Sequence, residues 1–461
     1  RDIGVTGVQT CALPISATSN YGVLIDGGAV VSSTKTTSGA GSITIAGIGR
    51  IASGSNGTRI QNSNSVIKSH VGAIDISGIG ATSTGLVVTA NAVIQSLGSG
   101  ASAATLSLTG SSTSTNDGDG VVIANNALVT SADGSTTING TTLGRHGVSL
   151  FGNAAITSTG TDGNSATITI NGKSGSHAAG SGVQLRDSDT RVDSQRGVVQ
   201  IDADGDDGLY GLELFSNARV QLHNASLVVN ATGGTASGIY LSSASSGRLL
   251  ATGDASIVLN VIQGALLMGA NSIIGGATAS GDITLVSDNV LITGGTIQST
   301  GDLIVRPTTA STSIGIGGGT GALDINDAVL ATIASGFNSI SIGQPGVSTG
   351  DVTVDTATFH APVTISGGTI YDSANGVDIT APSVTLAVDV SPGMSPGVLS
   401  IAGNATISSG KLVQIEFASA GNYDQVTTTG RFDIDTSATL LLSAMNGFVP
   451  STGQSFTIIN R

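Results

Sequence analysis

The feature that most constrains the fold of this chain is a short phrase that recurs along its first half. Each copy has a Gly, an apolar-polar-apolar triplet, a small polar turn and a second alternating run that often ends in Ser. Copies begin at these residues: Tyr21, Asn56, Thr84, Asp119, His146, Ser181, Tyr210 and Ser237. The leading Gly recurs every 27 to 35 residues. A repeat of this length is typical of solenoids and propellers.

A second phrase lies between the copies of the first, and its spacing is tighter. It reads SITIAG, AIDISG, TLSLTG and TITING in four of its copies. Successive anchor residues are 28 to 32 positions apart: Ile43, Ile74, Leu106, Thr136, Ile168, Val199, Leu227 and Ile257. Two independent phrases that keep one period of about 31 residues indicate a true repeat architecture.

The phrases predict strands, because apolar residues alternate with Thr, Ser and Asp, and successive side chains of a strand point to opposite faces. Gly, Asn and Asp mark the breaks between the runs. Three short strands in about 31 residues are too few for a propeller blade of roughly 40 to 45 residues. We therefore expect an all-β fold, a right-handed parallel β-helix whose coils stack about 4.8 Å apart. Roughly twelve or more such coils would give a rod on the order of 60 Å long.

The composition supports a thin aliphatic core and narrows the classes of partner. The chain of 461 residues has 68 Gly and 3% aromatic residues, yet 39% of it is hydrophobic. Its net charge of -14 argues against nucleic acid as a partner, since phosphate binding works through a basic surface. No apolar run is long enough to predict a membrane-spanning helix. The single cysteine, Cys11, allows no intrachain disulfide.

The N-terminal residues 1–15, RDIGVTGVQTCALPI, resemble the translation of a sequencing-library adapter. On this interpretation Cys11 is an artefact and the natural N-terminus is missing, so the sequence contains no information about a secretion signal. We expect a piece of a longer protein with four parts. They are the adapter at 1–15, β-helix repeats at 16–263, repeats of a second type at 264–385 and a C-terminal β module at 386–461.

The repeats after Gly264 carry a family resemblance. They read GDITLVSDNVLITGG from Gly281, STSIGIGGGTGALDIND from Ser311 and TGDVTVDTATFHAP from Thr349. These stretches resemble the repeat region of filamentous-haemagglutinin-type adhesins of the two-partner secretion class. The resemblance implies a secreted protein of the bacterial cell surface, exported through an outer-membrane pore. It also implies one short helical turn within 327–337, where Gly336 would end the helix.

The C-terminal part resembles the module that closes the passenger of many autotransporters. The residues that carry this resemblance are the doubled Ser-Pro-Gly at 391 and 395, the Tyr423-Asp424 pair and Gly447-Phe448. Prolines at 392 and 396 would end one strand ladder and begin another, which places the expected boundary near 386. The family normally continues beyond this module, so the export route and the anchor stay open.

One acidic loop suggests a weak calcium site. In IDADGDDGLYGLEL, Asp202, Asp204 and Asp206 match the first, third and fifth positions of a calcium loop, and Glu213 matches the twelfth. The required Gly is displaced to 208, so a solvated acidic loop is the simpler interpretation. The sequence predicts no catalytic residue and no cofactor.

Together these observations predict a rod-like adhesin fragment rather than an enzyme. Its expected partners are glycans or proteins of host or neighbouring bacterial surfaces. One alternative is a β-helical polysaccharide-degrading enzyme, which would need Asp202 to Asp207 beside Arg186 or Arg191 in one groove. The other is a purely structural protein of a biofilm or matrix.

Overall fold

The structure is a computed structural model, and it describes residues 21–37, 39–50, 54–206, 208–234, 236–242, 245–372, 376–393 and 395–461. Residues 1–15, with Cys11 and the resemblance to an adapter, therefore lie outside the described residues. The chain divides into two compact units, residues 1–280 and 281–461. Each unit is described by itself below. The four-part division expected from the sequence stays a prediction.

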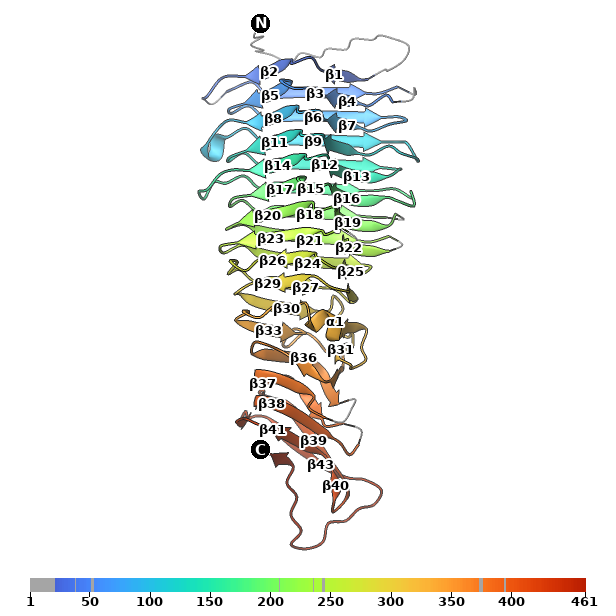
Figure 1. Cartoon of the computed structure of the whole chain (residues 1–461), viewed down its shortest axis with the longest axis vertical. Coiled ribbons are helices and arrows are strands. Elements are labelled where there is room, and N and C mark those ends of the chain that lie inside the picture. The colour runs from blue at the N-terminus through green and yellow to red at the C-terminus, as the bar shows by residue number, and fades with distance from the viewer. Residues whose placement is uncertain are drawn as a thin grey trace. The chain divides into compact units, whose positions relative to one another are not determined.

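Unit 1 is a parallel β-helix, as the repeats predict (Figure 1). The first half of every copy of the first phrase forms a strand of sheet A, and neighbouring strands pair in parallel in chain order. The strands of sheet A are β1 (Val23–Ile25), β4 (Thr58–Ile60), β7 (Leu86–Val88), β10 (Val121–Ala124), β13 (His146–Phe151), β16 (Ser181–Arg186), β19 (Tyr210–Phe215), β22 (Ser237–Leu241) and β25 (Leu266–Met268).

The second half of the same phrase forms sheet B, again with parallel neighbours. Its strands are β2 (Val30–Ser33), β5 (Val66–Ser69), β8 (Val93–Ser96), β11 (Leu128–Ser131), β14 (Ala155–Ser158), β17 (Arg191–Ser194), β20 (Arg219–His223), β23 (Arg248–Thr252) and β26 (Ile273–Gly275). The 3-10 helix η1 (Gly100–Ser102), which the sequence did not predict, follows β8.

The second phrase forms sheet C, which completes each coil. Its strands are β3 (Ile43–Ile48), β6 (Ile74–Gly80), β9 (Leu106–Ser112), β12 (Thr136–Thr142), β15 (Ile168–Lys173), β18 (Val199–Asp204), β21 (Ser226–Thr232) and β24 (Ser256–Gln263). The three strands per repeat and their parallel order confirm the fold expected from period and alternation.

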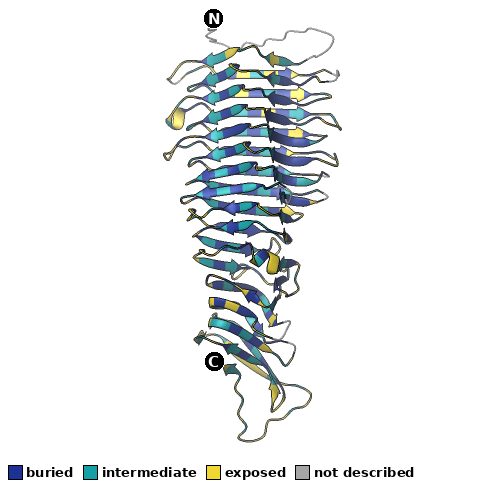
Figure 2. Ribbon diagram, viewed as in Figure 1, coloured by how far each residue is buried: buried dark blue, intermediate teal, exposed yellow. Residues whose placement is uncertain are grey.

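The core of unit 1 consists of aliphatic side chains stacked from coil to coil. Figure 2 shows buried positions, in dark blue, on the strands of every coil. In sheet A, Val121, Val148, Val183, Leu212 and Ile239 occupy one inward position and are completely buried. Burial of each such side chain contributes about 1.5–3 kcal/mol. Since every inward residue packs on its equivalent in the next coil, the fold needs no aromatic core.

The corner between sheets C and A explains why each phrase begins with Gly. A Cβ atom on Gly140 of β12 would lie 1.9 Å from the carbonyl oxygen of Gly147 in β13. A Cβ atom on Gly172 would lie 2.1 Å from the carbonyl oxygen of Gly182. The two backbones therefore touch at this corner, and a side chain at either position would separate them.

The corner between sheets A and B is a tight turn that uses asparagine. Asn125 and Asn126, between β10 and β11, have φ angles of 51° and 62°, and Asn217 in a later coil has 64°. Asn tolerates this left-handed conformation better than most residues. The Asn residues that mark breaks between the alternating runs of the sequence therefore lie at turns between strands.

Unit 2 is also built mainly from parallel pairings. Its elements are β27 (Ile283–Val286), β28 (Val290–Ile292), β29 (Thr296–Gln298), β30 (Asp302–Arg306), β31 (Ile314–Gly317), β32 (Leu323–Ile325), α1 (Asp327–Leu330), β33 (Ser339–Ile342), β34 (Val352–Asp355), β35 (Ala357–Thr358), β36 (Val363–Asp372), β37 (Ile379–Ser391), β38 (Val398–Ile407), β39 (Leu412–Ser419), β40 (Asn422–Tyr423), β41 (Gln425–Thr428), β42 (Phe432–Ile434), β43 (Thr439–Ala444) and β44 (Ile459–Asn460).

The short helix expected within 327–337 is present as α1, but it ends at Leu330, with Ala331 as its C-cap, and not at Gly336. The Asn326 side chain caps it by accepting hydrogen bonds from the backbone N–H groups of Ala328 (3.1 Å) and Val329 (3.2 Å). Val329 is buried and holds the turn against the unit. Within the described ranges, no helix has the length and apolar character of a membrane span.

Candidate functional site: a cationic groove on sheet A

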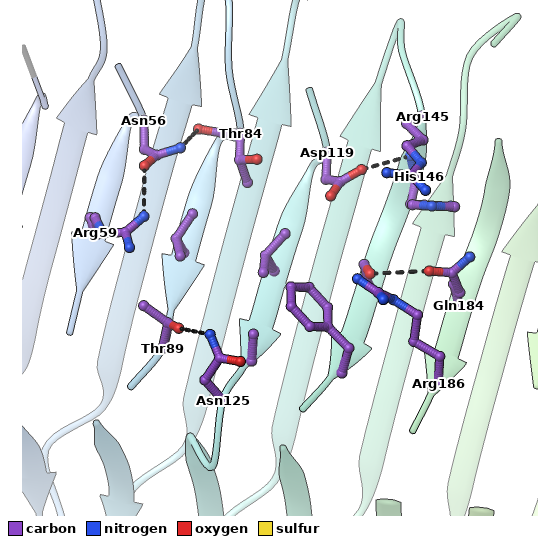
Figure 3. Close-up of a pocket in the computed structure, with 15 residues that line it drawn as sticks. Asn56, Arg59, Thr84, Thr89, Asp119, Asn125, Arg145, His146, Gln184 and Arg186 are labelled. Atoms are coloured by element: carbon purple, nitrogen blue, oxygen red, sulfur yellow. Dashed lines mark hydrogen bonds between the residues drawn. The ribbon is translucent and has the colours of Figure 1, made fainter. Parts of the chain in front are cut away.

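The outer face of sheet A carries a groove of about 280 Å³ that crosses five strands, β4, β7, β10, β13 and β16 (Figure 3). The register of the sheet builds it. The outward position two residues after the leading Gly is occupied in successive coils by Arg59, Val87, Val122, Ser149 and Gln184. One row of equivalent positions from five repeats therefore forms the centre of the groove.

The middle of the groove has an apolar floor. Val87 and Val122 point outward, yet they are only 6% and 7% exposed, and they pack with Ala124 and Phe151. Outward apolar side chains with so little exposure indicate that the neighbouring side chains and turns form walls around them.

Three guanidinium groups line this groove: those of Arg59, Arg145 and Arg186. Arg59 donates to the Asn56 Oδ1 atom (3.3 Å), and the guanidinium of Arg186 stacks over the Phe151 ring at 4.2 Å. Within the part of the chain that the structure describes, none of the three forms an ion pair with a carboxylate. The net charge of the chain is -14, so three unpaired cations on one face are a distinct feature.

Asp119 and His146 lie at one wall of the groove. The backbone N–H of His146 donates to the Asp119 Oδ1 atom (3.0 Å), and the His146 Nδ1 atom accepts from the Ser181 N–H (3.2 Å). Burial, helped by the charges of Arg145 and Arg186, lowers the pKa of His146 to about 3. The imidazole is therefore neutral, and its proton is on Nε2.

Burial also raises the pKa of Asp119 to about 6, although the His146 hydrogen bond and the Arg145 and Arg186 charges oppose this shift. Asp119 is thus ionised at neutral pH and loses its charge in weak acid. The Nε2 atom of His146 and the Nε atom of Arg186 are buried and have no hydrogen-bond partner among the described residues. Such buried donors are costly unless a ligand or water accepts from them.

Amide side chains around the groove are held by their neighbours. The Nδ2 atom of Asn56 donates to Ser83 Oγ (3.0 Å), and the Nε2 atom of Gln184 donates to the carboxylate of Glu213 (2.8 Å). These bonds fix the amide groups in place before any ligand binds. The lining is therefore polar, cationic and pre-organised, apart from its apolar floor.

A second hollow lies over sheet C, with a volume of about 380 Å³. Its cation, Lys173, pairs with Asp204 at 2.7 Å and with Asp206 at 3.5 Å. The charge on this face is thus satisfied within the chain, in contrast to the guanidinium groups on sheet A.

The structure places the four predicted calcium ligands on two different sheets. Asp202 and Asp204 lie on β18 of sheet C, Asp206 follows that strand, and Glu213 lies on β19 of sheet A. Asp204 and Asp206 share Lys173. Over the described residues, no three His, Cys, Asp or Glu side chains are arranged to hold a metal ion. The calcium hypothesis stays a prediction, and its four residues are not brought together.

The remaining two acids already have other partners. Glu213 accepts hydrogen bonds from Ser181 Oγ and Gln184 Nε2, both at 2.8 Å. Asp202 accepts from Asn230 Nδ2 and Gln200 Nε2, both at 2.7 Å. The bonds from Ser181, Gln184 and Asn230 join neighbouring coils, and the bond from Gln200 lies within β18; all four are structural contacts.

The arrangement that the enzyme alternative needs is not formed by the described acids. Arg186 ends β16 of sheet A, Arg191 begins β17 of sheet B, and the acids at 202 and 204 lie on sheet C. Asp207, the fourth acid of this loop, lies outside the described residues. The groove on sheet A contains Asp119 in place of these acids.

Sequence reasoning missed the groove, although a signal for it was present. Each of the three arginines lies close to the leading Gly of its own repeat. Arg145 lies two residues before that Gly, Arg59 lies two residues after it and Arg186 lies four residues after it. Aligning the phrases on that Gly would have placed Arg59 and Arg186 on one sheet and Arg145 directly before one of its strands. No protein-family model, curated protein or solved structure matches this chain. The family resemblance therefore rests on the sequence stretches quoted above.

Proposed function

We propose that this chain is part of a secreted bacterial surface adhesin, whose stacked coils attach the cell to host or neighbouring cells. The observation that carries the proposal is the cationic groove, which five successive repeats build on a lateral face of unit 1. A repeat that serves only to add coils has no need for three unpaired guanidinium groups in one groove.

The resemblance to two-partner adhesins and autotransporter passengers supports the same function. It implies export through an outer-membrane secretion pore and a location at the cell surface. Expected partners are glycans or proteins of host or bacterial surfaces. Many copies on one cell would convert weak contacts into firm attachment, since linked sites bind with a high effective concentration.

Attachment of coated beads tests the proposal. Beads carrying the full chain should adhere to epithelial or bacterial cells, and adhesion should rise more steeply than linearly with coating density. Beads coated with albumin at the same density provide the control. Adhesion no greater than that of albumin beads would contradict the proposal and would favour a purely structural matrix protein.

A further inference from the structure

We infer that the groove on sheet A binds a linear polysaccharide that bears carboxylate groups, a polyuronate. This inference rests on the proposed function and specifies its ligand class. Three features of the groove support it: the spacing of the cations, the floor between them and the chemistry of the guanidinium group.

The cations are spread along the groove rather than gathered at one point. Strands β4 and β16, which carry Arg59 and Arg186, are four strand spacings apart in sheet A, or about 19 Å. Arg145 directly precedes β13, three spacings from β4, or about 14 Å. A single small anion could contact the guanidinium groups at only one end of the groove. A polymer with a charge on each unit can meet both ends.

The surface between the cations suits sugar rings. Val87 and Val122 offer a narrow apolar strip for the C–H faces of the rings. Amide groups of Asn56 and Gln184 flank this strip and are already oriented, so they can bond hydroxyl groups at a small entropic cost. The predominantly polar lining favours a polyhydroxylated ligand over a lipid.

Guanidinium geometry favours a carboxylate as the anionic group. The planar fork of Arg matches the two oxygens of a carboxylate and binds them with paired hydrogen bonds. The Nε atom of Arg186 is a buried donor with no acceptor among the described residues. Arg186 is also held in place by the Phe151 ring.

Polygalacturonate oligomers are the probe for this inference, with dextran as the neutral control and dextran sulfate as the sulfated one. The full chain should bind polygalacturonate, and salt should weaken binding because the contacts are ionic. Arg59→Gln and Arg186→Gln should each weaken binding about tenfold, the effect of one lost charged hydrogen bond. Arg196→Gln, an exposed arginine beyond sheet B, should leave the affinity unchanged.

The outcomes separate this inference from the proposed function. Thermal denaturation of each variant must match that of the parent chain, and Arg186→Lys, which keeps the charge without the fork, should bind with intermediate affinity. Three results would overturn the inference. They are dextran binding as tight as polygalacturonate binding, binding of dextran sulfate but not of polygalacturonate, and full affinity in both Gln variants. Cell attachment without polygalacturonate binding would overturn it and leave the adhesin proposal standing. If the chain neither attaches to cells nor binds polygalacturonate, the inference and the adhesin proposal are both wrong.

Discussion

At the scale of single residues, unit 1 is most constrained where sheets C and A meet. The position of Gly140 in β12 is Gly in the earlier coils at 78 and 110, and also at 172, but later becomes Ala203, Ala231 and Val261. On the sheet C side of this corner, the need for Gly is thus a property of the early coils, where the groove lies. The sequence shows the Gly, but only the structure shows what it touches.

Replacing Gly140 by Ala should destabilise the chain by about 1–3 kcal/mol, because the new Cβ atom overlaps the Gly147 carbonyl oxygen. Gly163→Ala is the matched control, since a Cβ atom there meets nothing within 4 Å. Urea denaturation measures both. Equal stability of the two variants would contradict the close contact between the sheets.

A buried carboxyl group in unit 2 makes stability depend on pH. Burial, with Asp372 and Asp355 nearby, raises the pKa of Asp378 from its ordinary 3.8 to about 7. The folded state therefore binds this proton more tightly than the unfolded state. The stability from this group is complete below about pH 4 and is lost as the pH rises through about 7.

Asp378→Asn should remove much of this dependence, because the amide stays neutral. The variant should melt at a higher temperature than the parent chain at pH 8 and show a smaller change between pH 5 and pH 8. Asp75→Asn, which alters an exposed carboxylate on sheet C, is the control. If the pH dependence of the Asp378→Asn chain equals that of the parent, the buried charge is not its source.

At the scale of elements, side-chain ladders join the strands of sheet C on their outer face. Asn171 donates to Asn139 (2.7 Å), Asn230 donates to Asp202 (2.7 Å) and Asn260 donates to Asn230 (2.9 Å). Each bond links one coil to the next, in addition to the backbone hydrogen bonds. Asp202, the first residue of the predicted calcium loop, is thus one member of this ladder of side-chain hydrogen bonds.

Asn230→Asp should destabilise the chain by about 1–2 kcal/mol at low salt, since a carboxylate cannot donate to Asp202 and repels it. The double variant Asn230→Asp with Asp202→Asn should recover most of the loss, because the donor and acceptor are exchanged. Thermal denaturation at low and high salt measures both. Failure of the exchange to restore stability would show that the ladder contributes little.

The elements themselves were largely predictable. Alternation of Ile, Val and Leu with polar residues identifies the strands around Ile74 and Ile168, and the Asn-capped turn at α1 lies inside the expected range. The helix η1 was missed because its three residues carry no periodic pattern. The groove was missed because its arginines come from three repeats and share a face only once the coils are in register.

At the scale of the whole molecule, the repeat period predicted the stacking in unit 1 but not the chemistry on its surface. Parallel stacking turns one variable position per coil into a continuous row. The residues that determine the function of such a chain therefore lie at the outward positions, because the repeat pattern does not restrict which residue types occur there. Residues at inward positions, such as Val183 and Leu212, are completely buried and stabilise the fold.

Distances between spin labels on sheet B test the stacking most directly. With Cys11 replaced by Ser, one label at Lys68→Cys is combined in turn with a second label in a later coil, at Asp193→Cys, Gln221→Cys or Leu250→Cys. All four positions share one register row, at four, five and six strand spacings. The account predicts backbone separations of about 19, 24 and 29 Å, a rise of about 4.8 Å for each coil. Distances that do not increase with each added coil would contradict the stacked coils and the groove they build.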